Sequence, residues 1–440
     1  MTKKLLTLSL SFALILSGQA FSQATTSSRM AFTIDRVMAR VMTNQPLIDQ
    51  AEADLRAAQS RTGGARSSYF PKVTGSASWD HKIPQEQATL GSAVFTMTPA
   101  DYFDIHAGVS ELIYDFGKRD FQVKLAQSGE ENARLDLERI KSNIAYQTAQ
   151  TFYTILFLRQ EVEDINEQLA NLEQHLDDAR AREETGSSTH YDVLTTEVSV
   201  ASVKSQRIEA ASKLDNEKAM LAQLMGLGPA EDFTIEGTFA PADIGNDVEA
   251  LVEKAWGSRS ELREAVQAEK TADLNRALAS LGNKPSLSAS SALGFKNDLF
   301  TVDDIDVNDL QFNWSVGFIL NVPIFDGFLT ANQVAEASNK LVSAKDNTSA
   351  LRRSIRTEVE QALRNIVAAR EQVQNSLAQL EQARESLDIA KTQYEVGAAT
   401  NLQYLDSQTS LELAKLNNLT ALYHEMVSQL QLKQAIGEKI

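Results

Sequence analysis

Two periodicities of hydrophobic positions divide the chain, and each of them occurs twice. Residues 72–114 and 286–324 alternate apolar with small or polar side chains, which predicts paired β-strands. The clearest strand has apolar residues at Leu310, Phe312, Trp314, Val316, Phe318, Leu320 and Val322. Each strand pair precedes a long stretch without proline, residues 118–182 and 329–394, in which apolar residues recur every three or four positions. This spacing predicts two helices of roughly 100 Å that supercoil against neighbouring helices.

A single offset of 211 residues relates the two halves of the chain. It places Asp115 on Asp326 and Gly226 on Gly437 without a gap. A register kept over such a distance indicates a duplicated structural unit. The expected organisation is a signal peptide (1–24), a first repeat (25–226) with a β-hairpin at 72–114 and a helical hairpin at 118–226, a linker (227–248), and a second repeat (249–440) with a β-hairpin at 286–324 and a helical hairpin at 329–437.

Both long helices are predicted to reverse direction at a short tip of the same design. A glycine ends the long helix in the left-handed conformation, and a threonine three residues later caps the next helix. The partner side chain of a capping box follows after three more residues. These positions are Gly186, Thr189 and Asp192 in the first tip, and Gly397, Thr400 and Gln403 in the second.

Shorter elements are expected to complete the helical layer. Helices are predicted at 32–42, 46–66 and about 247–281, and the linker contains a strand-like segment near 233–235. The returning helices 190–225 and 401–436 are shorter than the long ones. The short helices can stack end to end with them and make up the difference, with the linker on the outside of the layer.

The N-terminus reads as a secretory signal. Lys3 and Lys4 precede an apolar run from Leu5 to Leu16, and small residues follow, so cleavage is expected after Ala20 or Ala24. This run is too short to span a bilayer, and the rest of the chain offers no run of about 18 apolar residues. If the mature protein enters a membrane, it is expected to do so with strands.

Composition narrows the chemistry. The net charge of −17 argues against a nucleic-acid partner, whose phosphates require Lys and Arg. The absence of cysteine excludes disulfides, thiolate metal sites and lipid attachment. The five histidines have no metal-ligand spacing, and there is no phosphate-binding glycine loop. Neither a cofactor nor an enzymatic activity is expected. The acidic segment 303–309 resembles the start of a calcium loop but lacks its glycine, so a solvated loop is the better interpretation.

Four strands with one apolar face suit a transmembrane barrel, with the strands of a small soluble sheet as the alternative. Four strands leave open edges, which hydrocarbon does not tolerate, so several chains would have to share one barrel. Two chains would give eight strands with a filled interior, and three would give twelve with room for a channel. Three is preferred if the helices continue the wall as a twelve-helix tube. A secreted or periplasmic structural coiled-coil protein without a pore remains the alternative function.

The chain resembles the TolC-like outer-membrane efflux proteins. The resemblance rests on the duplication, on the strand-to-helix junctions Ile113-Tyr114-Asp115 and Ile324-Phe325-Asp326, and on the paired tips. It implies a homotrimer with an outer-membrane β-barrel and a periplasmic α-helical barrel, used as a passive export duct in a tripartite efflux pump or type I secretion system. It also implies docking on a periplasmic adaptor protein coupled to an inner-membrane pump. The implied docking residues are Gly186, Thr189, Asp192, Val193, Leu194, Gly397, Thr400, Gln403 and Leu405.

The same resemblance implies a gate at the periplasmic entrance. Asp192 and Tyr394 match the pair that ties neighbouring hairpins together, although Asp192 can equally serve as a helix cap. Asp406 matches one acidic ring, which is expected to bind multivalent cations when three copies surround an axis. The family's basic residue is Ala399 here, and a second acidic position is Gln403. The resting entrance is therefore expected to leak more readily than in relatives with the full network.

Overall fold

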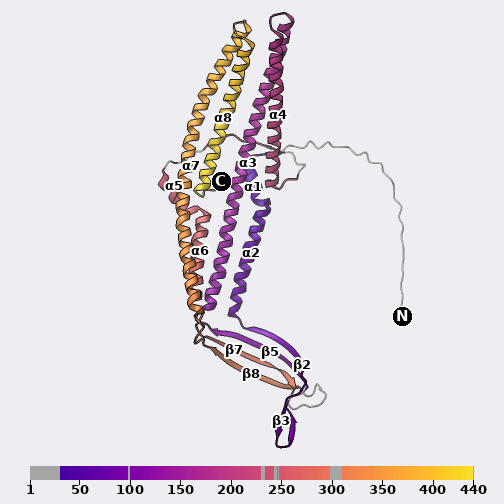
Figure 1. Ribbon diagram of the computed structural model, residues 1–440, viewed down its shortest axis with the longest axis vertical. Helices are drawn as coiled ribbons and strands as arrows, with labels where there is room; N and C mark the ends of the chain where they lie inside the picture. The colour runs from indigo at the N-terminus through magenta and orange to yellow at the C-terminus, as the bar shows by residue number, and fades with distance from the viewer. Residues whose placement is uncertain are drawn as a thin grey trace, which may run out of the picture.

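The computed structural model describes residues 30–97, 100–228, 233–241, 245, 247–297 and 310–439. The expected signal peptide and the acidic segment 303–309 lie outside these residues. Figure 1 shows a long helical part, with a curved sheet attached at one end and two helical tips at the other. None of the helices within these ranges is both long and apolar enough to cross a membrane.

The elements follow the duplication. The first half contains β1 (Met30–Phe32), α1 (Ile34–Asn44), α2 (Pro46–Arg66), the 3-10 helix η1 (Ser67–Tyr69), β2 (Lys72–His81), β3 (Gln87–Leu90), β4 (Ala93–Thr96), β5 (Asp101–Tyr114), α3 (Lys118–Glu184) and α4 (His190–Met225). The second half contains β6 (Phe233–Ile235), α5 (Val248–Ser258), α6 (Ser260–Ala279), β7 (Ser286–Asn297), β8 (Leu310–Asn321), α7 (Leu329–Glu395) and α8 (Asn401–Ala435).

The two predicted long helices are confirmed as α3 and α7, each of 67 residues. α3 packs against the returning helix α4, and α7 packs against α8. Their facing stripes bury separate apolar clusters along the layer instead of one thick core. The polar positions between those stripes stay near solvent, as expected for a wall one helix thick.

The short helices extend the returning ones, as predicted, but the helix expected at about 247–281 is two helices, α5 and α6. Arg259 has an extended backbone conformation between them (φ −66°, ψ 125°). The end of α8 lies against this break, because a Cβ added to Gly437 would stand 2.9 Å from the Arg259 nitrogen. The first repeat has the same arrangement, with Gly226 beside Asn44 at the break between α1 and α2.

The predicted strands form an antiparallel sheet in the order β2-β5-β7-β8. Its register places Trp79 opposite Phe103, Leu293 opposite Trp314, and Ala289 opposite Phe318. Directly opposed residues share a face, so the apolar positions of all four strands gather on one side of the sheet. The alternation read from the sequence is thereby confirmed as a single apolar face.

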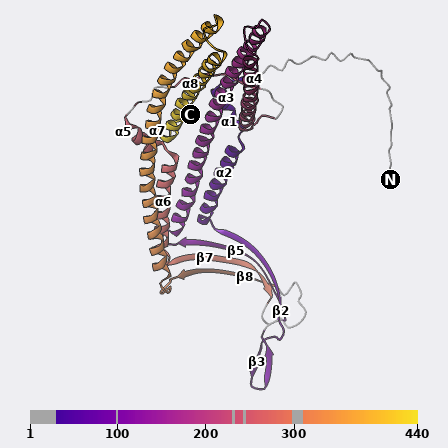
Figure 2. The same ribbon diagram turned by 45° about the horizontal axis from the view of Figure 1, so that its top comes forward.

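Two small features differ from expectation. The polar loop after β2 contains a second hairpin, β3 with β4, turning at Gly91 (φ 67°) and projecting beyond the sheet (Figure 2). The expected strand near 233–235 is β6, but it pairs in parallel with β1, which was not predicted. This two-stranded sheet rests on α3, where Arg159 Nη1 donates to the Ile235 carbonyl at 2.6 Å.

Candidate functional site

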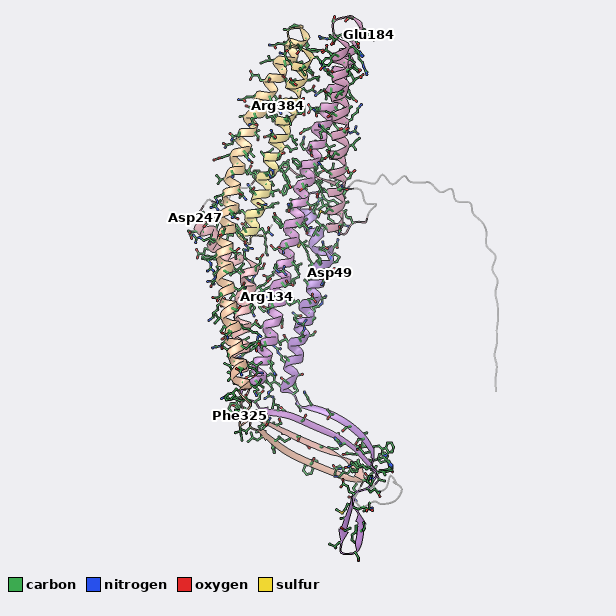
Figure 3. All side chains as sticks on the ribbon, viewed as in Figure 1. Asp49, Arg134, Glu184, Asp247, Phe325 and Arg384 are labelled. Atoms are coloured by element: carbon green, nitrogen blue, oxygen red, sulfur yellow. The ribbon has the colours of Figure 1, made fainter. Side chains whose placement is uncertain are left out.

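The two helical tips stand side by side at the end of the molecule farthest from the sheet (Figures 1 and 3). Gly186 and Gly397 have φ values of 77° and 78°, the left-handed conformation that glycine adopts without strain. The next amide in each tip bonds back across the turn, Ser187 to the Arg182 carbonyl at 2.8 Å and Ala398 to the Gln393 carbonyl at 2.7 Å. The two reversals are therefore built alike.

Both predicted capping boxes are present. The Thr189 hydroxyl accepts from the Asp192 amide at 3.2 Å, and the Asp192 carboxylate accepts from the Thr189 amide at 3.0 Å. In the second tip the Thr400 hydroxyl accepts from the Gln403 amide at 3.3 Å, and the Gln403 side chain accepts from the Thr400 amide at 2.8 Å. The caps fix where α4 and α8 begin.

The Asp192 carboxylate is held in place by this cap. Burial raises its pKa, but hydrogen bonds from the Thr189 hydroxyl and amide and from the Ser188 hydroxyl outweigh burial, so the net pKa is lowered. The Ser188 contact measures 3.2 Å. The capping role expected as an alternative for Asp192 is thus present, and its gating role stays a prediction.

The remaining predicted docking residues divide into buried and exposed positions. Val193 and Leu405 are buried in the apolar cluster that joins the ends of the hairpins, so they hold the tips together. Leu194 is exposed, as is Asp406 on α8. Three exposed apolar residues were not predicted: Tyr191, Val396 and Leu402. The sequence could have indicated them, because Val396 directly precedes the tip glycine Gly397, and Tyr191 and Leu402 each lie two residues after a capping threonine.

A second group missed by sequence reasoning lies between the hairpins, and we call it the inter-hairpin cluster. It consists of Arg182, His175, Tyr394, Asn401 and Tyr404. The centroid of the His175 imidazole lies 4.2 Å from the centroid of the Tyr404 ring and 5.2 Å from that of the Tyr394 ring. The Arg182 guanidinium lies 4.8 Å from the Tyr394 ring and donates to the Tyr394 carbonyl at 3.3 Å. Tyr394, predicted as a gate residue, therefore contacts the first hairpin through α3.

At the opposite end, aromatic side chains gather where strands turn into helices. The rings of Phe325, labelled in Figure 3, and Phe328 have their centroids 5.5 Å apart, and those of Tyr114 and Phe116 have theirs 4.9 Å apart. All four rings are exposed. Aromatic rings in such a row are typical of the boundary between a membrane and water.

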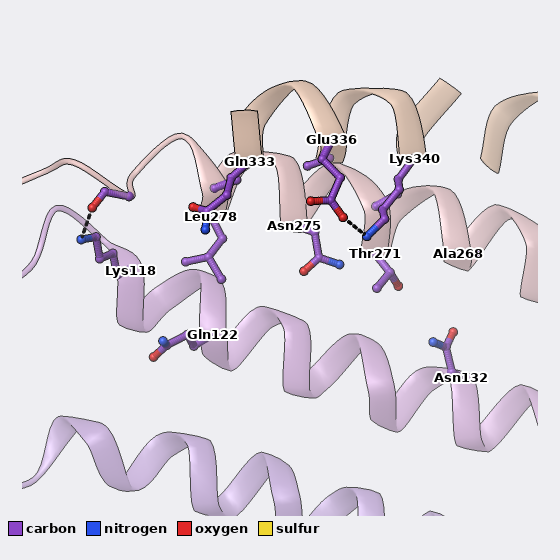
Figure 4. A pocket seen from close by; sticks show the side chains of 14 residues that line it. Lys118, Gln122, Asn132, Ala268, Thr271, Asn275, Leu278, Gln333, Glu336 and Lys340 are labelled. Carbon is purple, nitrogen blue, oxygen red and sulfur yellow. Dashed lines mark hydrogen bonds and ion pairs between the residues drawn. The ribbon is translucent and has the colours of Figure 1, made fainter. Parts of the chain in front are cut away.

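A groove of about 760 Å³ lies above this junction, between α3, α6 and α7 (Figure 4). Most of its side chains are polar, among them Gln122, Asn132, Asn275 and Gln333. Lys118 Nζ donates to the Gly282 carbonyl at 3.3 Å. In the described part of the chain no group of three or more His, Cys, Asp or Glu side chains could hold a metal ion. The groove is a surface of the wall that combines these polar side chains with small apolar ones such as Ala268 and Ala272.

These features define a class of protein: a membrane channel whose β-sheet continues into long helical hairpins. The profile described as "Outer membrane efflux protein" matches residues 37–227 and 251–438, so the chain belongs to that family. It is an outer-membrane efflux channel and not a secreted structural protein.

Individual relatives agree with this placement. The chain is 24% identical to the outer membrane protein TolC of Vibrio cholerae over 84% of this chain and 85% of the relative. It is 22% identical to the outer membrane efflux protein BepC of Brucella suis over 97% and 89%. Among solved structures, the CmeC outer membrane channel of Campylobacter jejuni shares the fold with a TM-score of 0.77. That match has 18% identity and covers 98% of this chain and 94% of the other.

Proposed function

We propose that three copies of the chain form a passive export duct, with a shared twelve-stranded barrel in the outer membrane and a twelve-helix barrel in the periplasm. The observation that carries this proposal is the sheet β2-β5-β7-β8, whose outer strands β2 and β8 have no further neighbour among the described strands. An open edge is costly in hydrocarbon, because each unpaired backbone group costs several kcal/mol. Pairing β8 of one chain with β2 of the next removes every edge.

The side chains of the sheet support the same arrangement. Trp79, Trp314 and Phe318 lie on the apolar face and are more than half exposed in a single chain. A patch of this kind marks a surface that meets lipid or another protein. The opposite face carries polar contacts, such as the Ser76 hydroxyl with His106 Nε2 at 2.8 Å, which suit a water-filled interior.

The helical tips are the proposed docking site for a periplasmic adaptor protein, and through it for an inner-membrane pump. Tyr191, Leu194 and Leu402 supply exposed apolar side chains beside the capped turns, and exposed aromatic and aliphatic groups are what a partner would bury. Asp192, Tyr394 and Asp406 are the proposed entrance residues. Energy for transport would come from the pump, since the duct supplies a path only.

The barrel is tested with two neighbouring positions in the middle of β8. Val316 is on the apolar face, and Ser315 is on the other. Val316→Lys should reduce membrane insertion strongly, because a Lys on the lipid face costs about 2–4 kcal/mol at mid-membrane. Ser315→Lys is the matched control and should still insert. The measurements are recovery from the outer-membrane fraction, particle mass in detergent and currents in planar bilayers.

The outcomes are distinct. A three-chain particle that conducts, with only Val316→Lys failing to insert, is expected. A single-chain particle, silent bilayers from the inserted protein, or equal insertion of both variants would contradict the proposal.

A further inference from the structure

The inter-hairpin cluster contains a buried histidine whose hydrogen bond places a proton on its Nε2. His175 is 6% exposed, and its Nε2 lies 2.7 Å from the Asn401 Oδ1. The amide nitrogen of Asn401 faces the other way, 3.1 Å from the Asp192 carbonyl, and the Thr195 and Thr196 hydroxyls stand at 3.3 Å. Because an amide oxygen in that place would face the Asp192 carbonyl oxygen, the amide nitrogen occupies it and the amide oxygen accepts from the imidazole. His175 therefore carries a proton on Nε2.

This bond joins elements that are far apart in the chain. His175 belongs to α3, Asn401 is the first residue of α8, and Asp192 lies in the first turn of α4. Asn401 is 4% exposed and thus links the second tip to both helices of the first hairpin. If the amide leaves, the imidazole N–H loses its partner in a buried place, which is unfavourable. The Asp192 carbonyl still accepts from the Thr195 and Thr196 hydroxyls at 3.0 and 2.8 Å. The bond between His175 and Asn401 is therefore a buried polar link between the two tips, in addition to the apolar cluster that contains Val193 and Leu405.

A second proton on His175 would place a cation between two tyrosine rings. The charged and titratable groups around it are Asp178 and Arg182 on α3, Asp192 on α4, Tyr394 and Glu395 on α7, and Tyr404 on α8. Burial is the main effect and lowers the pKa of His175, and Arg182 adds to it. The bond to Asn401 and the charge of Asp178 act in the opposite direction but are weaker.

We propose that His175 and Asn401 form a pH-sensitive latch between the two helical tips of one protomer, which holds the entrance closed near neutral pH and releases it in acid. The proposal rests on the proposed function in so far as the tips form the entrance of the duct. Its basis is the fixed hydrogen bond, the burial of both side chains and their position between the hairpins.

The direction follows from proton linkage. A histidine freed from the cluster has a pKa of about 6.5, and the docked histidine has a lower one. Below about pH 6.5 the separated tips bind a proton that the docked tips do not, so acid favours separation. Above that pH both forms are neutral and the latch has its full strength. Between pH 7.5 and 5.5 the ratio of separated to docked tips should rise, by at most about tenfold if the docked histidine stays neutral throughout.

The test measures the distance between the tips directly. Ser187 and Ala398 are exposed, and the chain has no native cysteine, so Ser187→Cys and Ala398→Cys accept a spin-label pair at known positions. In the full-length protein in detergent, the distance distribution should be narrow at pH 7.5 and gain a longer component at pH 5.5. Single-channel conductance of the unlabelled protein should rise over the same interval.

Three variants make the test specific. His175→Gln keeps an N–H donor near the Nε2 position but does not titrate, so its tips should stay docked at both pH values. His175→Leu removes the donor and should show separated tips at both. His190→Gln is the control, because His190 lies exposed at the first tip, paired with Glu183 at 2.9 Å, and the wild-type response should persist.

The result that overturns the latch is a pH response that survives in His175→Gln, or tips that stay docked in His175→Leu. The distance measurement does not require a channel, so it separates this proposal from the duct. Conducting trimers with pH-independent tips would refute the latch alone. Silent bilayers with a His175-dependent change in distance would refute the duct and retain the latch.

Discussion

The two helical tips come from the same duplicated unit, and they differ where their helices begin. Both have a left-handed glycine, a capping threonine and a complete capping box. The residue after the threonine is His190 in the first tip and Asn401 in the second. His190 points to solvent and pairs with Glu183, whereas Asn401 is buried between the hairpins.

The difference shows which parts of the tip set its shape and which set its contacts. The glycine lets the chain turn so that carbonyls at the end of the long helix find donors, and the capping box satisfies the free amides at the start of the next helix, so both are needed in both copies. The first helical residue is not used by the cap and is free to differ. In the second tip this residue is Asn401, which links the hairpins because its amide nitrogen donates to acceptors of the first hairpin, chiefly the Asp192 carbonyl.

The largest expected difference in stability between the tips comes from replacing His190 or Asn401, each in its own variant, by leucine. Asn401→Leu leaves the His175 N–H buried without a partner, which costs about 1–3 kcal/mol. His190→Leu removes an exposed ion pair only and should change stability by less than about 0.5 kcal/mol. Hydrogen exchange of the tip amides measures both. Equal protection in the two variants would show that the tips are not asymmetric.

The caps should give a smaller effect that is the same in both tips. Thr189→Ala and Thr400→Ala each remove one hydroxyl acceptor and should cost about 1 kcal/mol. Amide protection should fall by a similar factor in the first turn of α4 and of α8. Thr409→Ala, further along α8, is the control and should leave both first turns protected. A loss confined to one tip would mean that the two capping boxes differ in strength.

Sequence reasoning was successful where the determinants are local. The uninterrupted heptad spacing gave α3 and α7 to within two residues of their ends, and alternation gave the apolar face of the sheet. Gly186 and Thr189 identified the first tip because a left-handed turn and a cap each depend on a few adjacent residues. The expectation of membrane strands also followed from these patterns, because backbone pairing restricts what can cross a bilayer. The efflux class and the outer membrane came from the resemblance to the TolC-like proteins.

What was missed depends on partners distant in the sequence. The break at Arg259 coincides with the end of α8, and nothing near residue 259 indicates that Gly437 will lie there. His175 and Asn401 are 226 positions apart, so neither suggests the other. The histidine occupies a heptad position where it could have been an ordinary surface residue. The gating roles of Asp192, Tyr394 and Asp406 remain predictions, since they depend on an entrance formed by several chains.

The smallest expected effect concerns charge at the third helical position, Asp192 in one tip and Gln403 in the other. A carboxylate at the start of a helix stabilises it by about 0.3–1 kcal/mol at low ionic strength. Because the pKa of Asp192 is lowered in the folded protein, this contribution is complete above the usual value near 3.9 and is lost as the pH falls through the lowered one. Amide protection against hydrogen exchange should therefore decrease in the first tip below about pH 4. It should stay unchanged in the second tip, because the Gln403 side chain does not titrate.

The matched variant is Gln403→Glu, which should give the second tip the same acid sensitivity. The comparison is made in a His175→Gln background, so that the buried imidazole does not titrate in either protein. Protection factors are taken relative to unstructured peptides at each pH, since exchange itself depends on pH. If both tips lose protection together in the background protein, the acid response does not come from the Asp192 cap. If Gln403→Glu leaves the second tip insensitive, the carboxylate stabilises the first tip through its contacts with Ser188, which the second tip lacks because it has Ala399 at that position.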